Sequence, residues 1–177
     1  MRAWPFGLVS WLDREAELWA VEHSKMTHRD PIAVAACAAI ASGIQLAVRQ
    51  GATIEMIVDE MIAAARRYSE KTADMMQQAV DEARNGTGPE VTLDRLRGWA
   101  AHEAIAAALY VFVRHPDDAR AAILEGANTP GDSDSIASLA GALVGAHVGI
   151  AGLPVEWVRD VERSDELQAL AVDLARP

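Results

Sequence analysis

Cysteine, aromatic residues and basic residues are all scarce in this sequence. Cys37 is the only cysteine among 177 residues, which excludes an intrachain disulfide and a zinc site built from cysteines. It stands within an alanine run, where we expect a small buried side chain. Aromatic residues make up 5% of the chain, so the core must be mainly aliphatic. The 16 lysines and arginines are outnumbered by 26 acidic residues, and the net charge of −10 argues against nucleic acid and anionic membranes as partners.

The sequence also lacks an apolar segment of the about 20 residues that a membrane-spanning helix needs. Two alanine-rich stretches, 32–48 and 136–151, come near this length, but Gln45 and His147 interrupt them. No apolar region followed by a small-residue cleavage site stands at the start. With 51% hydrophobic and 24% charged residues, the composition is that of an ordinary globular domain. We therefore expect a soluble, cytoplasmic protein.

Nearly every periodic segment indicates a helix, and no alternating run predicts a strand. Asp30 and Pro31 form an N-cap and first-turn proline, which predicts a long helix to about Arg49. Thr53 begins the next helix, and two glycines before Pro89 interrupt the pattern. The sequence therefore predicts a single all-α domain over residues 1–177. Four other helices are expected over residues 70–84, 90–97, 99–115 and 118–126. Three more are expected to begin at residue 132 or 133, at residue 154 and at residue 164.

Three glycines, Gly141, Gly145 and Gly149, recur at four-residue spacing in one of these predicted helices. Glycines at this spacing leave one helix face flat, so that a neighbouring backbone can approach closely. In an acidic chain without a membrane span, this pattern predicts the central helix of a tightly packed bundle.

The segment richest in oxygen donors is Gly131-Asp132-Ser133-Asp134-Ser135. Carboxylates and hydroxyls suit Mg²⁺, Mn²⁺ or Ca²⁺ rather than a soft metal. Asp132 must lie before the first helical turn and Asp134 and Ser135 within it, because residues two apart on a helix point in different directions. Helix capping is the alternative, and the spacing alone favours it, because Asp and Ser are the usual N-cap residues.

The five histidines show no metal-binding spacing. His28 lies just before a helix start, where ligands often bind, but by itself it is more typical of a solvated turn. His147, on the glycine-rich helix, is expected to pack against its neighbours. The sequence also lacks the GxSxG, GxGxxG and GxxxxGK[ST] motifs, which argues against serine hydrolases and the common nucleotide-binding folds.

Several segments together resemble the ADP-ribosylglycohydrolase family, which includes the dinitrogenase-reductase-activating glycohydrolases. The most specific is Gly-Asp-Ser-Asp-Ser (131–135), followed by a Gly-Ala-rich helix and then Pro-x-x-Trp (154–157). Similar matches are Trp-Ala-Ala-His-Glu-Ala over 99–104, His-Pro-Asp-Asp over 115–118, Thr-His-Arg-Asp-Pro over 27–31, and Met-Arg-Ala-Trp-Pro at the start. The likeness therefore extends over nearly the whole chain.

The resemblance implies a compact, orthogonal all-α bundle with a binuclear Mg²⁺ or Mn²⁺ centre that removes ADP-ribose from modified protein side chains. By position, Asp132, Asp134 and Ser135 would be metal ligands, and His28 would line the ADP-ribose pocket. The expected partner is an ADP-ribosylated protein or a small molecule containing ADP-ribose. No catalytic acid or base is assigned.

The resemblance is incomplete, because the family's Ser/Thr-Asp-Asp metal motif is absent and Pro116-Asp117-Asp118 lacks its hydroxyl. The sequence looks like the carboxy-terminal half of the family's domain, without the amino-terminal helices. We therefore expect half of the metal site, little or no activity of the chain alone, and self-association or pairing with the missing half. Two rival hypotheses remain: a non-catalytic helical interaction module, and a purely structural bundle in which Asp132 is only a helix cap.

Overall fold

The computed structural model describes residues 1–9 and 15–174, and this part of the chain contains α-helices and short 3₁₀ helices but no strand. The predicted all-α class is confirmed. The elements are η1 (Trp4–Leu8), α1 (Ala16–Lys25), α2 (Pro31–Ala47), α3 (Ile54–Arg66), α4 (Glu70–Arg84), α5 (Pro89–Arg95), α6 (Ala101–Arg114), α7 (Ala119–Ala127), α8 (Ser133–Val148), η3 (Ile150–Gly152), α9 (Val155–Asp160) and α10 (Ser164–Leu174). Among the described residues, no helix is long and apolar enough to cross a membrane.

Side-chain caps explain where several helices begin. The Asp30 carboxylate accepts a hydrogen bond from the Ile32 N–H at 2.9 Å, and Thr53 Oγ1 accepts one from the Met56 N–H at 3.3 Å. These bonds satisfy backbone donors that a helix N-terminus leaves free. The predicted starts of α2 and α3 are therefore confirmed.

The start of α6 differs from the prediction by two residues. The segment from Gly98 to Ala100 is a connection rather than a first turn, because Gly98 has a φ of +80° and Ala100 is extended. The helix begins at Ala101, where the Glu103 carboxylate accepts a hydrogen bond from the Ala100 N–H at 3.2 Å.

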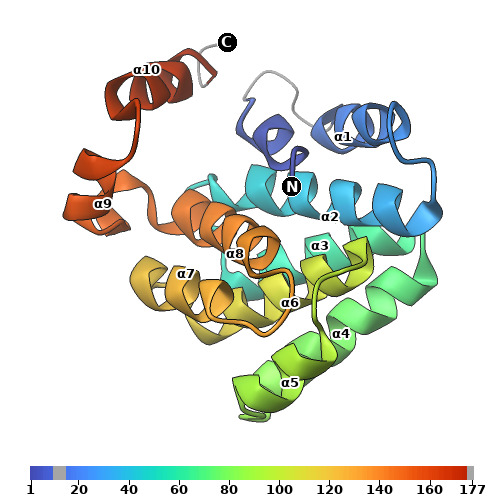
Figure 1. Ribbon diagram of the computed structural model, residues 1–177. Coiled ribbons are helices and arrows are strands. Elements are labelled where there is room, and N and C mark those ends of the chain that lie inside the picture. The colour runs from blue at the N-terminus through green and yellow to red at the C-terminus, as the bar shows by residue number, and fades with distance from the viewer. Residues whose placement is uncertain (10–14, 175–177) are drawn as a thin grey trace.

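The centre of the bundle is formed by α2 and α6, not by the glycine-rich α8 as the glycine spacing predicted. Eleven of the 17 residues of α2 are buried, and this helix contacts η1, α1, α3, α4, α6 and α8. Figure 1 shows α2 running across the middle of the molecule, with α1 and η1 on one side and α6, α7 and α8 on the other. The alanines of α2 allow this close packing on several sides.

The helices α7 and α8 approach closely at Gly126 of α7, and one of the three predicted glycines, Gly141, also faces α7, where a Cβ would lie 3.2 Å from Ile123 Cγ1. A Cβ on Gly126 would lie 2.8 Å from Ala137 Cα, whereas one on Gly145 would meet only Leu153 Cδ2 at 3.8 Å. Gly126 was expected just beyond the end of its helix, yet it lies inside α7. Gly149 ends α8 with a φ of +68°.

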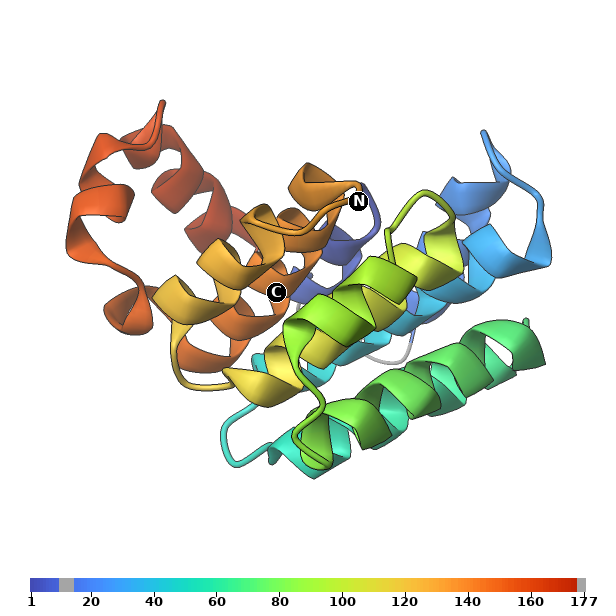
Figure 2. The same cartoon turned by 60° about the horizontal axis from the view of Figure 1, so that its bottom comes forward.

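The last two helices lie outside the central bundle. Neither α9 nor α10 has a buried residue, and Figure 2 shows them at the end of the molecule away from α3 and α4. The Pro-x-x-Trp segment holds α9 against α7, because the Arg120 guanidinium lies 4.7 Å from the centre of the Trp157 ring and pairs with Glu156. This motif therefore has a structural role.

Candidate functional site

A cleft of about 390 Å³ opens between the chain start, the α1–α2 connection, α2, and the beginnings of α6 and α8. His28, Asp132 and Ser135, three of the four site residues expected from the sequence, all line it. Cys37 also lines it and is half-buried rather than fully buried. Apolar side chains of α2, α6 and α8 complete its walls. The fold thus brings residues from the first and last thirds of the chain to one cavity.

The loop before α8 arranges its oxygen donors as the sequence predicted. Asp132 occupies the N-cap position, with φ −75° and ψ +66°, while Asp134 and Ser135 lie in the first turn. Asp134 is exposed outside the cleft lining, and Ser135 is buried in the cleft wall. Asp132 and Ser135 therefore belong to the cleft lining, whereas Asp134 does not.

Asp132 makes no side-chain capping bond to α8. The neighbouring Asp132 side chain and the backbone N–H of Ser135 lower the pKa of Asp134. The capping alternative therefore lacks the hydrogen bond that defines it. Two adjacent carboxylates are suited to share a cation.

The donor set at this loop is small. Among residues 1–9 and 15–174, no group of three or more His, Cys, Asp or Glu side chains is arranged to hold a metal ion. Asp132, Asp134 and Ser135 offer two carboxylates and a hydroxyl, all hard oxygen donors that fit Mg²⁺ or Mn²⁺. Because such ions take about six ligands, water or other groups would have to complete the shell.

The cleft wall opposite His28 consists of two loops in backbone contact. A Cβ on Gly131 would lie 2.6 Å from the Arg97 carbonyl carbon, and closer still to its oxygen, which accepts a hydrogen bond from the Asp132 N–H at 2.7 Å. A Cβ on Gly98 would lie 3.1 Å from Ile136 Cδ1. Glycine is needed at both positions to bring the α5–α6 connection against the start of α8.

Trp99 follows directly after this contact and lines the cleft with 73% of its surface exposed. Exposed tryptophan at the rim of a cavity is typical of binding surfaces, because its ring offers a large flat contact area. The sequence pattern around Trp99 did not indicate a binding role. The available signal was a tryptophan directly after a glycine, at the first position of the helix predicted over 99–115.

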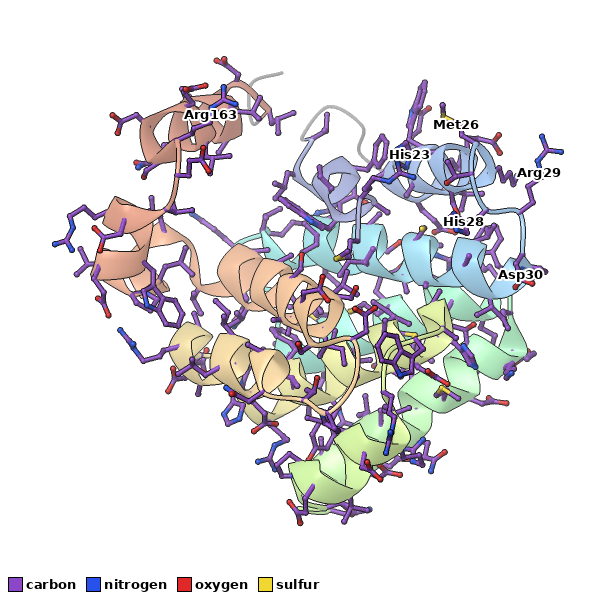
Figure 3. The ribbon with its side chains drawn as sticks, viewed as in Figure 1. His23, Met26, His28, Arg29, Asp30 and Arg163 are labelled. Carbon is purple, nitrogen blue, oxygen red and sulfur yellow. The ribbon has the colours of Figure 1, made fainter. Side chains whose placement is uncertain are left out.

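On the other side of the cleft, His28 is held by the end of α1. Its backbone N–H donates to the Ser24 carbonyl at 2.7 Å, and the Ser24 hydroxyl donates to the His28 carbonyl at 3.3 Å. Figure 3 shows His28 between α1 and α2 and His23 on the side of α1 toward η1, whereas Met26 and Arg29 are directed outward. His23 is tilted against Phe6, with ring centres 5.3 Å apart. Both histidines line the cleft.

The remaining histidines lie outside the cleft lining. His147 packs edge-on against Phe112, as expected, and lies 3.4 Å from an Asp117 carboxylate oxygen. His102 is 6% exposed, and its Nδ1 has no hydrogen-bond partner among the described residues. Burial lowers the pKa of His102, and the charge of Lys71 lowers it further. Neither His102 nor His147 lines the cleft of the candidate site.

A second hollow, of about 340 Å³, lies between α1, α2 and α3. Its polar lining includes Glu17, Glu60 and Arg67, but the Arg67 guanidinium is already paired with both carboxylates. Charges that neutralise one another leave less electrostatic attraction for a ligand. The first cleft is therefore the stronger candidate.

Comparison with known proteins gives a family match over the whole chain. The model of the ADP-ribosylglycohydrolase family matches residues 1–177. "ADP-ribosylarginine hydrolase Tri1" of Pseudomonas putida (strain GB-1) is 30% identical over 168 residues, which cover 90% of this chain and 40% of that protein. "ADP-ribosylhydrolase ARH3" is 31% identical over 124 residues in Homo sapiens, covering 63% of this chain and 33% of that protein. The protein of the same name from Mus musculus is 32% identical over 97 residues, which cover 49% of this chain and 26% of that protein. The chain thus spans less than half the length of these relatives.

Proposed function

The chain belongs to the ADP-ribosylglycohydrolase family, and on this premise we propose that it takes part in the metal-dependent removal of ADP-ribose from modified protein side chains. The relatives carry the names of an ADP-ribosylarginine hydrolase and an ADP-ribosylhydrolase, so the reaction class is hydrolysis of an ADP-ribosyl bond. The observation that carries the proposal is the shared cleft of His28, Trp99, Asp132 and Ser135. It combines oxygen donors for a cation with an exposed aromatic ring and an imidazole.

Asp132, Asp134 and Ser135 would hold Mg²⁺ or Mn²⁺ at the start of α8. This assignment is supported by the closeness of the Asp132 and Asp134 side chains and by the missing capping bond of Asp132. When bound, the metal would supply positive charge for orienting ribose hydroxyls and stabilising charge as the glycosidic bond breaks. The chain's own part is to hold two carboxylates in a fixed geometry, through the backbone bond between Asp132 and Arg97.

The other cleft residues would bind ADP-ribose itself. The exposed Trp99 ring can stack on the adenine base, which is typically worth about 1–3 kcal/mol. His28 and Arg2, on the opposite side of the cleft, provide hydrogen-bond donors for the oxygens of the diphosphate and ribose. Together these groups suit a ligand with an aromatic base at one end and an anionic group beside it.

The described donors are too few for a binuclear centre, so we propose that the other ligands come from another segment or a partner chain. The family's paired metals need more carboxylates than Asp132 and Asp134 provide. The chain alone would then bind metal weakly and show little hydrolysis. Pairing with a complementary chain would restore activity.

A thermal melt with and without millimolar Mg²⁺ or Mn²⁺ tests the metal site. A ligand at 100 times its Kd stabilises the folded state by about 2.7 kcal/mol. We expect a metal-dependent rise in Tm that is lost in Asp134→Ala. Asp165→Ala, which removes an exposed first-turn carboxylate from α10, is the matched control and should keep the rise. If Asp134→Ala responds to metal as the unmodified chain does, the proposed ligands are wrong.

Hydrolysis of ADP-ribosylarginine, measured as release of ADP-ribose, tests the enzymatic part. The assay compares the chain alone with the chain mixed with the amino-terminal portion of a relative. Full activity of the chain alone would overturn the shared-site proposal. If neither sample cleaves ADP-ribosylarginine or ADP-ribosylserine, the hydrolase proposal fails.

The alternative function is that of an interaction subunit without catalysis. It is favoured by α10, which buries no residue and leaves Leu167, Leu170 and Val172 about half exposed. Apolar side chains exposed along one helix are typical of contact surfaces. Static light scattering tests this: a strict monomer at all concentrations, with no binding to the complementary portion, would contradict it.

A further inference from the structure

Three side chains on one side of the cleft are joined in a hydrogen-bonded row. Arg2 stands just before η1, whereas Thr27 and His28 belong to the connection between α1 and α2. The Arg2 guanidinium Nη2 lies 3.1 Å from Thr27 Oγ1, and the same oxygen lies 3.0 Å from His28 Nδ1. Arg2, Thr27 and His28 all line the cleft. We refer to them as the Arg2–Thr27–His28 row.

The first bond in this row has only one possible direction. A guanidinium carries N–H donors and no acceptor, so Thr27 Oγ1 must accept from Arg2. The threonine hydroxyl then keeps one proton and one lone pair for its bond with His28. A cation that donates to a hydroxyl oxygen polarises the O–H bond and makes its proton a better donor. The favoured second bond therefore runs from the Thr27 hydroxyl to Nδ1 of His28.

This direction decides which nitrogen of His28 carries the proton. If Nδ1 accepts a hydrogen bond, the neutral ring must have its proton on Nε2. The backbone of His28 is fixed at the same time by its two hydrogen bonds with Ser24, which is itself only 5% exposed. The bond with Thr27 thus favours one tautomer of the ring, and the bonds with Ser24 hold the backbone of His28.

We propose that Arg2 and Thr27 are positioning residues that hold His28 as an Nε2–H hydrogen-bond donor toward an oxygen of the ligand in the cleft. The identity of that ligand, a molecule containing ADP-ribose, rests on the proposed function. The ring then serves to bind a phosphate or ribose oxygen and does not accept a proton from the substrate. The orientation of the row itself does not depend on the ligand.

Nitrogen NMR of the histidine rings tests the row without ligand or metal. The full chain, labelled with ¹⁵N-histidine, is examined at about pH 8, where histidines are normally neutral. The His28 signals are those missing from His28→Gln. We expect Nδ1 at the unprotonated limit. In Thr27→Val, which keeps the shape but removes the hydroxyl, its signal should move toward the protonated form, whereas Thr27→Ser should leave it unchanged.

Arg2→Met provides a second variant that is independent of Thr27. It should shift the His28 signals in the same direction as Thr27→Val, while His115 and His147, outside the cleft, serve as internal controls. The inference is overturned if His28 carries its proton on Nδ1 in the unmodified chain. It is also overturned if Thr27→Val leaves the Nδ1 signal in place.

Calorimetric titration with free ADP-ribose then tests the role of the donor. Loss of one hydrogen bond of ordinary strength should weaken binding by about 2- to 10-fold in Thr27→Val, and Thr27→Ser should restore it. Equal affinity of the two variants would overturn the ligand-facing role. If the unmodified chain binds no ADP-ribose while the NMR result stands, the proposed function fails and the Arg2–Thr27–His28 row is retained.

Discussion

Replacing Gly131 by alanine tests how firmly the loop before α8 is held against the α5–α6 connection. The added Cβ would lie 2.6 Å from the Arg97 carbonyl carbon and 2.7 Å from its Cα, distances at which backbone must move. The Arg97 carbonyl oxygen also accepts the Asp132 N–H at 2.7 Å. A displaced loop would therefore lose this hydrogen bond and shift the Asp132 carboxylate.

The expected cost follows from these two effects. Overpacking costs about 1–3 kcal/mol, and loss of the hydrogen bond costs about 0.5–1.5 kcal/mol. Alanine also restricts the unfolded chain, which offsets about 0.4–1 kcal/mol. The net loss in the free energy of unfolding is about 0.5–4 kcal/mol. For a chain of this size, it corresponds to a fall in Tm of about 1–16 °C.

Thermal and urea unfolding followed by circular dichroism provide the measurement, with Gly145→Ala as the matched control. Position 145 lies inside α8, and a Cβ there meets only Leu153 Cδ2 at 3.8 Å. The control should therefore gain about 0.5–1 kcal/mol from better helix propensity. If Gly131→Ala is as stable as the unmodified chain while Gly145→Ala behaves as expected, the backbone contact described here does not constrain the loop.

Three further predictions concern a cap, a buried histidine and the exposed tryptophan. Asp118→Ala should cost about 1 kcal/mol, because its carboxylate accepts the Ala121 N–H at 2.9 Å. Asp132→Ala should cost clearly less in urea unfolding, because Asp132 makes no capping bond, and equal losses would contradict this. Burial lowers the pKa of His102, so its stabilising effect is complete above pH 6.5 and is lost as the pH falls through the lowered value. The unmodified chain should therefore lose more stability on acidification than His102→Gln, and parallel curves would refute the assignment. Trp99→Ala should change stability by less than about 0.5 kcal/mol but weaken ADP-ribose binding roughly 5- to 150-fold; unaltered affinity in calorimetry would exclude stacking.

The helix starts at Asp30 and Thr53 could be predicted because their causes are local. In each case a side-chain oxygen bonds a backbone N–H two or three residues away, so the sequence pattern contains the whole interaction. The start of α6 was placed two residues too early for the opposite reason. The backbone at Gly98 has a positive φ where it packs against Ile136, a residue far along the chain.

The glycines show how one residue type can serve several roles. The spacing of Gly141, Gly145 and Gly149 suggested a flat face on a central helix, yet between α7 and α8 the tightest contact lies at Gly126 of α7. Local pattern identified Gly126 as a helix terminator, whereas it lies within α7, where any side chain would meet Ala137. Which distant residue packs against a glycine is decided by tertiary packing, so it cannot be predicted from the residues that flank the glycine in the sequence.

The sequence by itself determined the all-α class, most helix boundaries and the division of oxygen donors between Asp132 before the helix and Asp134 and Ser135 within it. These features depend on interactions between residues that are close along the chain. Only the tertiary structure decided that α2 and α6 form the centre and that Arg2 and His28 share a cleft with Trp99 and Asp132. The cleft depends on the close packing of the α5–α6 connection against the start of α8, which Gly98 and Gly131 allow. Short-range sequence patterns carry no information about which distant segment will pack against a glycine.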